Sequence, residues 1–442
     1  MSGATREPIG VIGTGYVGLV TAAGFAELGS EVWCIDIDHD KIEGLRQGRI
    51  PIYEPGLDAL VERHRGRLHF STDLADALEH ARLLFVAVGT PPTYSGDADL
   101  SAVHAVVDSM PPSDRHALIM KSTVPSGTGD SIKRIFREHG KDGFSYVSCP
   151  EFLKEGSAIK DFLEPDRVVV GDDGDWAGDA VVDLYSAIDA PLVRTDIRSA
   201  EMVKLASNAF LATKISFINE IANVCEETGA DVVEVARGMG LDERIGPKFL
   251  QAGIGYGGSC FPKDVAALKQ LAGNSGYHFQ LLNAVIEVNE LQKRRVISKL
   301  QKHLGSLVGK EIALLGLAFK PDTDDMREAS SLVLSARLLA DGARVRAYDP
   351  VAEDEARKLL SGLDYRPSAL DAVDGADAIV LVTEWPEFRE LDLAEVAGRM
   401  RGRLLIDGRN FLDPQGAGEA GLTYEGVGRG PANIGREAWA RV

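Results

Sequence analysis

The sequence predicts an α/β protein with two Rossmann-like domains, joined by a long central helix and a helical middle domain. Three observations support this fold class: short apolar runs alternate with helical stretches up to about Val170, the alternation stops near Asp196, and it resumes from Lys310. Strands that alternate with helices are typical of a parallel sheet covered by helices. We therefore expect three domains, at residues 1–196, 197–305 and 306–442.

The first domain contains six apolar runs that predict strands. Helical periodicity between these runs predicts helices, for example over residues 20–28 and 131–139. The predicted strands cover residues 9–12, 31–35, 83–88, 117–121, 145–148 and 168–170.

The middle of the chain is predicted to be helical. Residues 199–228 contain no Gly or Pro, and they are followed by Gly229, which suits the position just after a helix. A Gly-rich loop over residues 251–259 comes next, and a second long helix is predicted from about Phe279 to His303.

The last domain repeats the pattern of the first. In both halves the second strand ends in an aspartate, Asp36 in the first and Asp349 in the last. This echo predicts a second Rossmann-like domain; the alternative is a chance likeness between apolar strands. The predicted strands cover residues 312–315, 344–348, 378–382 and 404–406.

The composition excludes several classes of protein. Of 442 residues, 45% are hydrophobic and 26% are charged, as in ordinary globular proteins. No apolar run reaches eighteen residues and no apolar signal segment precedes the first strand, so we expect no membrane span and a cytoplasmic location. The net charge of −19 disfavours nucleic acid and anionic membranes as partners. Helix N-termini can still bind a phosphate-bearing small molecule.

The cysteines are widely spaced. They form no C-x-x-C pair and have no histidines at ligand spacing, which argues against a disulfide scaffold and against a zinc site. No metal is predicted. Cys34 and Cys225 lie in apolar segments and are expected to be small core residues.

The pattern Gly13-x-Gly15-x-x-Gly18 follows the first predicted strand and opens a helix. In a dinucleotide-binding turn the first glycine makes the turn, the second admits the pyrophosphate and the third lets helix and strand pack closely. Asp36 ends the second strand, where a carboxylate binds a ribose hydroxyl and repels a 2′-phosphate. The pattern therefore predicts NAD rather than NADP; the alternative is a glycine-rich turn that binds nothing.

Polar residues follow other predicted strands, at the edge where open α/β sheets bind ligands. Thr90 and Thr123 can reach a cofactor there, although each alone can equally be a turn or a helix cap. Glu151 and Glu155 follow another strand, where carboxylates can position water or accept protons. The alternative for these two is a charged loop.

Cys260 lies in the most informative segment, residues 257–264, and Pro262 suits the first turn of a helix. A helix N-terminus favours the thiolate form of cysteine, which is a nucleophile. Asp264 follows one helical turn later on the same face, where it can hold a base or a water. The alternative is a buried structural cysteine.

Lys204 and Asn208 are four residues apart on the predicted long helix and project side by side. A cation beside an amide donor can stabilise a developing oxyanion. The alternative for Lys204 is an ordinary solvated side chain.

Four motifs together closely resemble the UDP-glucose 6-dehydrogenases of the UDP-glucose/GDP-mannose dehydrogenase family. They occur in the family's order, within a resemblance that runs from residue 9 to about residue 413. The departure is Cys149, where the family often has Asn, and it leaves the oxidation assignment intact. The motifs are residues 13–18 (GTGYVG), 150–156 (PEFLKEG), 257–264 (GGSCFPKD) and 316–320 (GLAFK) with Arg327.

The resemblance implies NAD as cofactor, UDP-glucose as substrate and UDP-glucuronate as product. It implies an NAD-binding first domain, a middle domain with the Cys260 loop and dimer contacts, and a UDP-sugar-binding last domain. Cys260 is implied to trap an aldehyde and to carry a thioester. The other implied catalytic residues are Lys204 and Asn208 for the oxyanion, and Asp264, Glu151 and Thr123 for protons and water.

The resemblance also implies the binding residues. Arg244 resembles an arginine donated across a dimer interface, which implies a homodimer or a higher homo-oligomer. The implied cofactor contacts are Gly13, Gly15, Tyr16, Val17, Gly18, Asp36, Lys41, Thr90, Thr123, Glu155, Lys263 and Arg327. The implied substrate contacts are Glu151, Phe152, Leu153, Lys154, Glu155, Lys204, Asn208, Arg244, Phe249, Leu250, Gln251, Ala252, Gly253, Gly257, Lys320 and Arg409.

A thiol nucleophile indicates a four-electron oxidation, since a dehydrogenase that stops at the aldehyde needs none. Three alternatives remain: the same chemistry on another nucleotide sugar such as GDP-mannose, a non-catalytic NAD-binding scaffold, and a cysteine hydrolase. Phe261 leans toward UDP-glucose in family terms. The intact set of Lys204, Asn208, Cys260 and Asp264 argues against a scaffold. No histidine is placed to pair with Cys260, which argues against a hydrolase.

Overall fold

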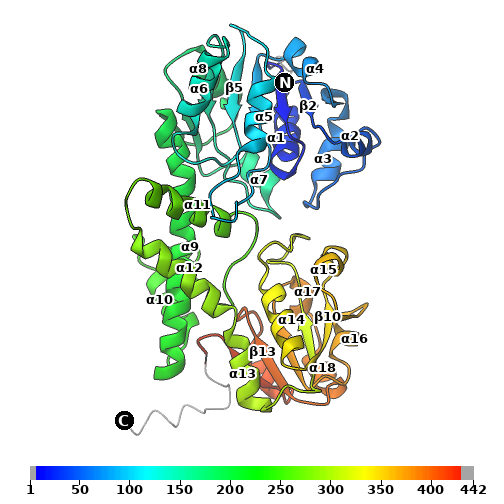
Figure 1. The fold of residues 1–442 in the computed structure, drawn as a ribbon. Helices are drawn as coiled ribbons and strands as arrows, with labels where there is room; N and C mark the ends of the chain where they lie inside the picture. The colour runs from blue at the N-terminus through cyan, green and yellow to red at the C-terminus, as the bar shows by residue number, and fades with distance from the viewer. Residues whose placement is uncertain (1–5, 430–442) are drawn as a thin grey trace. The chain divides into compact units, whose positions relative to one another are not determined.

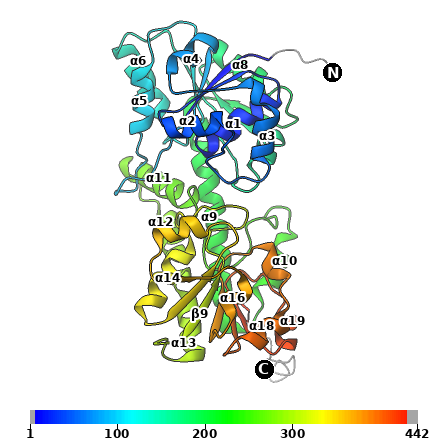
Figure 2. The same cartoon turned by 90° about the vertical axis from the view of Figure 1, so that its right-hand side faces the viewer.

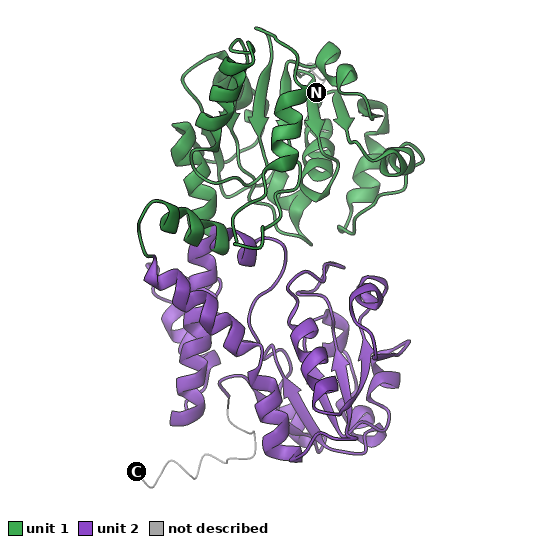
Figure 3. Cartoon of the chain, in the orientation of Figure 1, with its two compact units in different colours: residues 1–207, 266–278 green, residues 208–265, 279–442 purple. Residues whose placement is uncertain are grey.

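A computed structural model describes residues 6–429 of the chain. The chain divides into two compact units, which Figure 3 colours separately. The first comprises residues 1–207 and 266–278, and the second comprises residues 208–265 and 279–442. Two helices, α9 (Ile197–Thr228) and α11 (Phe261–Asn274), each contribute residues to both units. The units divide the chain differently from the three expected domains, whose boundaries stay a prediction.

The first unit contains a sheet of eight strands in the order β3-β2-β1-β4-β5-β6-β7-β8. Neighbouring strands are parallel except β6 and β7, which run antiparallel. The strands are β1 (Ile9–Ile12), β2 (Val32–Ile35), β3 (Leu68–Ser71), β4 (Leu83–Val86), β5 (Ala117–Met120), β6 (Ser145–Ser148), β7 (Val168–Gly171) and β8 (Leu192–Thr195).

Successive residues of a strand point to opposite faces of this sheet. In β4, Phe85 belongs to one buried apolar cluster, whereas Leu84 and Val86 belong to another. Both faces are therefore covered, which explains the continuous apolar runs of the sequence. The helices of this unit are α1 (Tyr16–Glu27), α2 (His39–Arg46), α3 (Leu57–Arg63), α4 (Leu74–His80), α5 (Ser101–Ser109), α6 (Thr128–Glu138), α7 (Ala158–Leu163) and α8 (Trp176–Tyr185), with a 3₁₀ turn at Arg65–Arg67.

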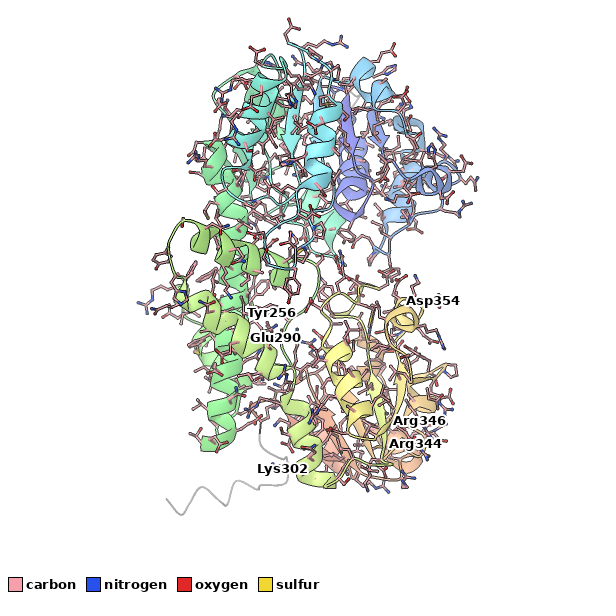
Figure 4. All side chains as sticks on the ribbon, in the orientation of Figure 1. Tyr256, Glu290, Lys302, Arg344, Arg346 and Asp354 are labelled. Atoms are coloured by element: carbon pink, nitrogen blue, oxygen red, sulfur yellow. The ribbon has the colours of Figure 1, made fainter. Side chains whose placement is uncertain are left out.

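The second unit contains a sheet of six parallel strands in the order β11-β10-β9-β12-β13-β14. Arg344 and Arg346 of β10, labelled in Figure 4, both pair with Glu311 of the neighbouring strand β9. The strands are β9 (Glu311–Leu315), β10 (Arg344–Tyr348), β11 (Asp364–Tyr365), β12 (Ala378–Leu381), β13 (Leu404–Asp407) and β14 (Thr423–Gly426). The helices are α10 (Val232–Gly240), α12 (Gln280–Gln292), α13 (Arg295–Leu304), α14 (Ser330–Ala340), α15 (Glu353–Leu359), α16 (Ala369–Val373), α17 (Pro386–Arg389), α18 (Leu393–Arg399) and α19 (Pro414–Glu419).

The two sheets share one topology. Counted along the chain, the first six strands of the first sheet and the six strands of the second both follow the order 3-2-1-4-5-6. This is the order of the doubly wound dinucleotide-binding fold. Figures 1 and 2 show both sheets with the helices that accompany them. The predicted fold class, with two Rossmann-like domains, is confirmed.

The long helix predicted over residues 199–228 is confirmed as α9, which ends at Thr228. Gly229 follows with a φ of 76°, a left-handed conformation that glycine adopts without strain. Within residues 6–429, no helix has the length and apolar character that crossing a membrane requires.

The prediction of one helix from Phe279 to His303 is wrong, because α12 and α13 are separated at Lys293 and Arg294. At the break the N–H of Arg294 bonds to the carbonyl of Leu291, in the tighter spacing of a 3₁₀ turn. The buried Lys293 side chain pairs with Glu290 at 2.9 Å. The segment contains neither Gly nor Pro, so the sequence pattern gives no sign of the break.

Candidate active site

The turn after β1 has the geometry of a dinucleotide-binding turn. Gly13 has a φ of 94°, and a Cβ on Gly18 would lie 1.8 Å from the carbonyl oxygen of Gly13, so neither position admits a side chain. Nothing lies within 4 Å of a Cβ built on Gly15. Gly15 also precedes α1 without any side-chain cap, so the N–H groups of the first turn are available to an anion. The turn therefore fits a pyrophosphate.

Asp36 follows β2 and is tied to this turn. Its Oδ2 accepts hydrogen bonds from the N–H and the hydroxyl of Thr14, both at 2.8 Å, and from Lys41 at 2.9 Å. Partial burial alone would raise the pKa of Asp36, but the bonds from Lys41 and Thr14 hold that pKa below its ordinary value. The carboxylate is therefore ionised and able to bind a ribose hydroxyl.

The matching aspartate of the second unit, Asp349, is arranged differently. Its Oδ2 accepts from the N–H groups of Leu317 and Ala318, at 2.6 and 3.0 Å, and from the indole N–H of Trp385 at 3.1 Å. The side chain is almost fully buried, and this oxygen is hydrogen-bonded within the protein. The first unit, with its GxGxxG turn, is the one suited to the dinucleotide.

Thr90 and Thr123 lie together just after β4 and β5. The Thr90 hydroxyl donates a hydrogen bond of 2.8 Å to the carbonyl oxygen of Thr123. The structure thus brings both predicted residues to the carboxyl edge of the sheet, where ligands bind. Their contacts with a cofactor stay a prediction.

Glu151 and Lys204 form a buried ion pair in the first unit. The two charged atoms are 2.7 Å apart, and the side chains are 5% and 4% exposed. Burial by itself raises the pKa of Glu151, but the charge and hydrogen bond of Lys204, with the Leu153 N–H and the charge of Lys121, lower it below the ordinary value. The pair places an ionised carboxylate and a cation at the end of β6.

The segment after Glu151 is held by further contacts. The ring of Phe152 lies under Arg167, whose guanidinium is 3.5 Å from the ring centre, and under Lys204 at 5.4 Å. Lys154 is exposed and pairs with Asp161 at 3.2 Å. The negative charge of Glu155 acts on Tyr16. Burial, Glu54 and Glu155 together raise the pKa of the Tyr16 hydroxyl. Glu155 therefore lies near the start of α1.

Cys260 immediately precedes α11, and its carbonyl accepts the N–H of Asp264 at 2.9 Å. The predicted location at a helix N-terminus is confirmed. The hydroxyl of Ser259 lies 3.5 Å from the Cys260 sulfur. In the same unit the loop before Cys260 is fixed by Asn289 of α12, whose side chain bonds both the N–H and the carbonyl of Tyr256.

Asp264 connects Cys260's helix to α9. Its carboxylate is almost fully buried and accepts hydrogen bonds from the Asn208 amide and from Lys263, both at 2.6 Å. Lys204 and Asn208, predicted as neighbours on α9, are thus each engaged by a carboxylate, Glu151 for the first and Asp264 for the second.

Arg409 holds three loops of the second unit together. Its guanidinium donates to the carbonyls of Gly255 at 2.9 Å, Val382 at 2.8 Å and Phe319 at 3.3 Å. A hollow of about 240 Å³ lies beside it. The hollow is lined by Val232, Val233, Ala236, Arg237, Pro247, Leu250, Gln251, Ala252, Arg409 and Asn410, which include four of the predicted substrate contacts.

Among the described residues, four that are not glycine have positive φ angles, and they lie in loops of the second unit. Besides glycines, positive φ angles occur at Phe249 (65°), Asp322 (61°), Glu328 (52°) and Asn410 (54°). A Cβ on Gly257 would lie 2.2 Å from the carbonyl oxygen of Glu328, so this glycine is required for close approach. Strained residues of this kind persist mainly at functional sites.

Other predicted residues are placed less tightly. The exposed Arg244 pairs with Asp242 at 2.6 Å, and the exposed Arg327 pairs with Asp325 at 2.7 Å. The Lys320 ammonium lies 5.2 Å from the ring centre of Phe319. Their ligand contacts stay predictions.

Sequence reasoning missed two asparagines that shape the site, the buried Asn219 and the half-buried Asn410. Asn219 of α9 accepts the N–H of Gly253 at 2.9 Å, and the amide of Asn410 donates to the carbonyls of Ala252 and Val427. Isolated asparagines in a helix or loop carry no motif, so only the fold reveals them. Among residues 6–429 no group of three or more His, Cys, Asp or Glu is placed to hold a metal ion.

Three family models match the chain in order. They describe the NAD binding, central and UDP binding domains of the UDP-glucose/GDP-mannose dehydrogenase family, and match residues 7–189, 198–291 and 313–414. The UDP-glucose 6-dehydrogenase YwqF of Bacillus subtilis is 48% identical over 431 residues, covering 95% of this chain and 97% of its own. A UDP-glucose 6-dehydrogenase of Pseudomonas aeruginosa is 47% identical over 442 residues, with coverage of 95% and 97%.

Solved structures agree with this assignment. A UDP-glucose dehydrogenase from the archaeon Pyrobaculum islandicum superposes with a TM-score of 0.90 at 40% identity, covering 97% of this chain and 99% of its own. These findings confirm the resemblance and the prediction of NAD as cofactor. The chain belongs to the UDP-glucose/GDP-mannose dehydrogenase family and is an NAD-dependent oxidoreductase.

Proposed function

We propose that the chain oxidises UDP-glucose to UDP-glucuronate in a four-electron reaction at Cys260. In this reaction two hydrides leave the sugar carbon, one water enters, and the primary alcohol becomes a carboxylate. The observation that carries the proposal is the cysteine at the start of α11, with the buried Asp264–Asn208 pair one helical turn away. The UDP-glucose 6-dehydrogenases at 47–48% identity support the choice of substrate.

Cys260 supplies the covalent step. As a thiolate it adds to the aldehyde formed by the first oxidation and gives a thiohemiacetal; the second oxidation converts this to a thioester, which water hydrolyses. NAD, when bound, accepts one hydride in each oxidation, and the turn at Gly13, Gly15 and Gly18 with Asp36 fits it. A helix N-terminus next to the sulfur favours the thiolate.

Asn208 and Lys204 are proposed to stabilise the oxyanion. The Asn208 amide carries two N–H donors, and Asp264 takes one of them, so the second can serve the substrate. The Lys204 ammonium donates a hydrogen bond of 2.7 Å to Glu151 and supplies a buried positive charge beside Asn208's turn of α9. Glu151, ionised at neutral pH, is proposed to orient the hydrolytic water with Thr123 and Asp264.

Substrate binding is proposed for the two groups of residues that the family resemblance implies. In the first unit these are residues 151–155, where Glu155 also faces the cofactor. In the second unit they are residues 249–253 with Gly257, Lys320 and Arg409, and the hollow beside Arg409 supports this assignment. Arg244 is proposed to reach the site of a second copy. A cytoplasmic location stays a prediction.

The first experiment is the yield of NADH per UDP-glucose at completion, with NAD in excess. Two NADH per sugar, with UDP-glucuronate as product, are expected because Cys260 carries the substrate through both oxidations. NADP in place of NAD should support poor turnover, since Asp36 repels a 2′-phosphate. One NADH per sugar, or an aldehyde product, would contradict the proposal.

GDP-mannose is the main competing substrate, because the family also includes enzymes that oxidise it. The relatives at 47–48% identity, which are UDP-glucose 6-dehydrogenases, favour uridine. UDP should therefore compete with UDP-glucose at concentrations where GDP does not. Turnover of GDP-mannose at a higher kcat/KM than UDP-glucose would reverse the assignment.

A homodimer, at least, is proposed to form along α9. Phe210, Phe217 and Val224 are spaced by seven residues and lie on one face of the helix, and their exposed fractions are 65%, 49% and 56%. An apolar stripe of this length on a surface helix is a mark of an interface. A second copy is its natural partner, because two such stripes are self-complementary about a two-fold axis.

The Phe217→Glu variant tests this interface. A charge in the middle of the stripe should halve the mass measured by light scattering at micromolar concentration, because the carboxylates of two copies would face each other without water. Leu359→Glu is the matched control, since Leu359 is an exposed apolar residue of the same unit that lies outside the stripe. A wild-type chain that is already monomeric would disprove the proposed dimer.

A further inference from the structure

Glu54 is a buried carboxylate in the loop between α2 and α3. Only 6% of the residue is exposed. It belongs to none of the groups that bind or react in the proposed function. Its oxygens accept hydrogen bonds from three donors that come from two other segments of the first unit.

Two of these donors are backbone N–H groups at the end of the segment that begins at Glu151. The N–H of Gly156 bonds to Oε2 at 2.6 Å, and the N–H of Ala158 bonds to Oε1 at 2.7 Å. Ser157, at the start of α7, makes no side-chain cap of its own. Glu54, which lies about a hundred residues earlier in the chain, therefore accepts hydrogen bonds from N–H groups at a helix start that have no partner within the helix.

The third donor is the hydroxyl of a residue at the start of α1, the helix that follows the glycine turn. Tyr16 is the first residue of α1, directly after Gly15, and its hydroxyl bonds to Oε2 of Glu54. Burial, and then the hydrogen bond and charge of Glu54, raise the pKa of Tyr16. The hydroxyl thus keeps its proton and remains a donor to Glu54.

We propose that Glu54 is a positioning residue that ties residues 151–156, which the proposed function assigns to the sugar, to the glycine turn that binds the cofactor. The peptide unit between Glu155 and Gly156 is planar, so the bond from Gly156 N–H also fixes the carbonyl of Glu155. At the other end of the segment Glu151 is fixed by Lys204. Glu54 therefore sets where the Glu155 end of the segment lies relative to Gly15, while Lys204 holds the Glu151 end.

The Glu54→Gln variant is the direct test. Its side chain keeps the volume but presents an NH₂ group to one of the three donors, so at least one bond is lost. We expect kcat with UDP-glucose to fall about tenfold or more, because small displacements of reacting groups are costly. The affinity for NAD without sugar should stay within about twofold, since the glycines and Asp36 are intact.

A second readout needs no substrate. Hydrogen exchange of the peptide that contains Gly156 and Ala158 should be faster in Glu54→Gln than in the wild type, because at least one of the two amides loses its acceptor. Tyr16→Phe keeps both of these bonds, so exchange there should rise less and kcat should fall less. Glu54→Asp retains the charge with a shorter reach and should give an intermediate kcat.

Glu62→Gln is the matched control, since Glu62 is an exposed glutamate of the nearby α3. Wild-type kcat in a folded Glu54→Gln protein, or a lower melting temperature without a change in kcat, would overturn the positioning role. Equal losses of NAD affinity and kcat would also overturn it, because Glu54 would then support the turn alone. If the wild type leaves UDP-glucose unchanged, the proposed function is refuted. The hydrogen-exchange comparison of the wild type with Glu54→Gln would still test whether Glu54 holds residues 156–158.

Discussion

The Cys260→Ala variant is expected to form UDP-glucuronate on the order of 10³-fold more slowly than the wild type, or not at all, because it removes the nucleophile. The aldehyde can then form but cannot be held as a thiohemiacetal for the second oxidation. NADH formation should stop at or below one equivalent per enzyme-bound sugar. The measurement is a single-turnover experiment with enzyme in excess over UDP-glucose, followed at the absorbance of NADH.

The Cys260→Ser variant separates the steps. A hydroxyl is a far weaker nucleophile than a thiolate, so the pathway should stall at the aldehyde or at the resulting ester. Cys225→Ala is the control, because it removes a buried thiol from the same unit without touching Cys260. Its activity should match the wild type. Uronate formed by Cys260→Ser at the wild-type rate would refute the covalent mechanism.

Sequence reasoning worked best where a local motif has one structural meaning. The run of Gly13, Gly15 and Gly18 after an apolar strand leaves few backbone solutions, and the structure has the expected turn and an uncapped helix. The same holds for Pro262, which placed Cys260 at a helix start. In both cases a single residue type restricts the backbone, so neighbours in the sequence suffice.

The rest of the fold depends on contacts that a local pattern does not contain. The strands β3, β8, β11 and β14 were not predicted. All four are edge strands of their sheets, and β8 is mostly exposed. The partners of Lys204 and Asn208 likewise come from segments more than fifty residues away. No local sequence pattern contains a contact over such a separation.

The Lys204→Met variant is expected to lose about 3–5 kcal/mol of stability at neutral pH, because it leaves the buried Glu151 carboxylate without its partner. Methionine keeps most of the length of the side chain, so the loss reports mainly the charge rather than a cavity. The measurement is the free energy of unfolding of the wild type and the variant in urea. Equal stability at neutral pH would contradict the role of the ion pair.

The loss should depend on pH in a defined direction. In the wild type Lys204 outweighs burial and keeps the Glu151 pKa below its unfolded value of 4.5, so the pair stabilises above that value and stops doing so as the pH falls through the lowered pKa. In Lys204→Met, burial prevails and raises the Glu151 pKa, so the folded variant takes up a proton as the pH falls. The stability gap should therefore be widest at neutral pH and narrow toward pH 4.5.

The double variant Glu151→Gln/Lys204→Met separates stability from chemistry. With both charges gone, no buried carboxylate is left unpaired, so most of the lost stability should return. Activity should not return, because the cation proposed for the oxyanion and the carboxylate proposed for the water are both missing; kcat should stay at least about 10²-fold below the wild type. Recovery of activity together with stability would mean that the pair only supports the fold. Persistent inactivity in a stable protein would place Lys204 and Glu151 in the chemistry itself.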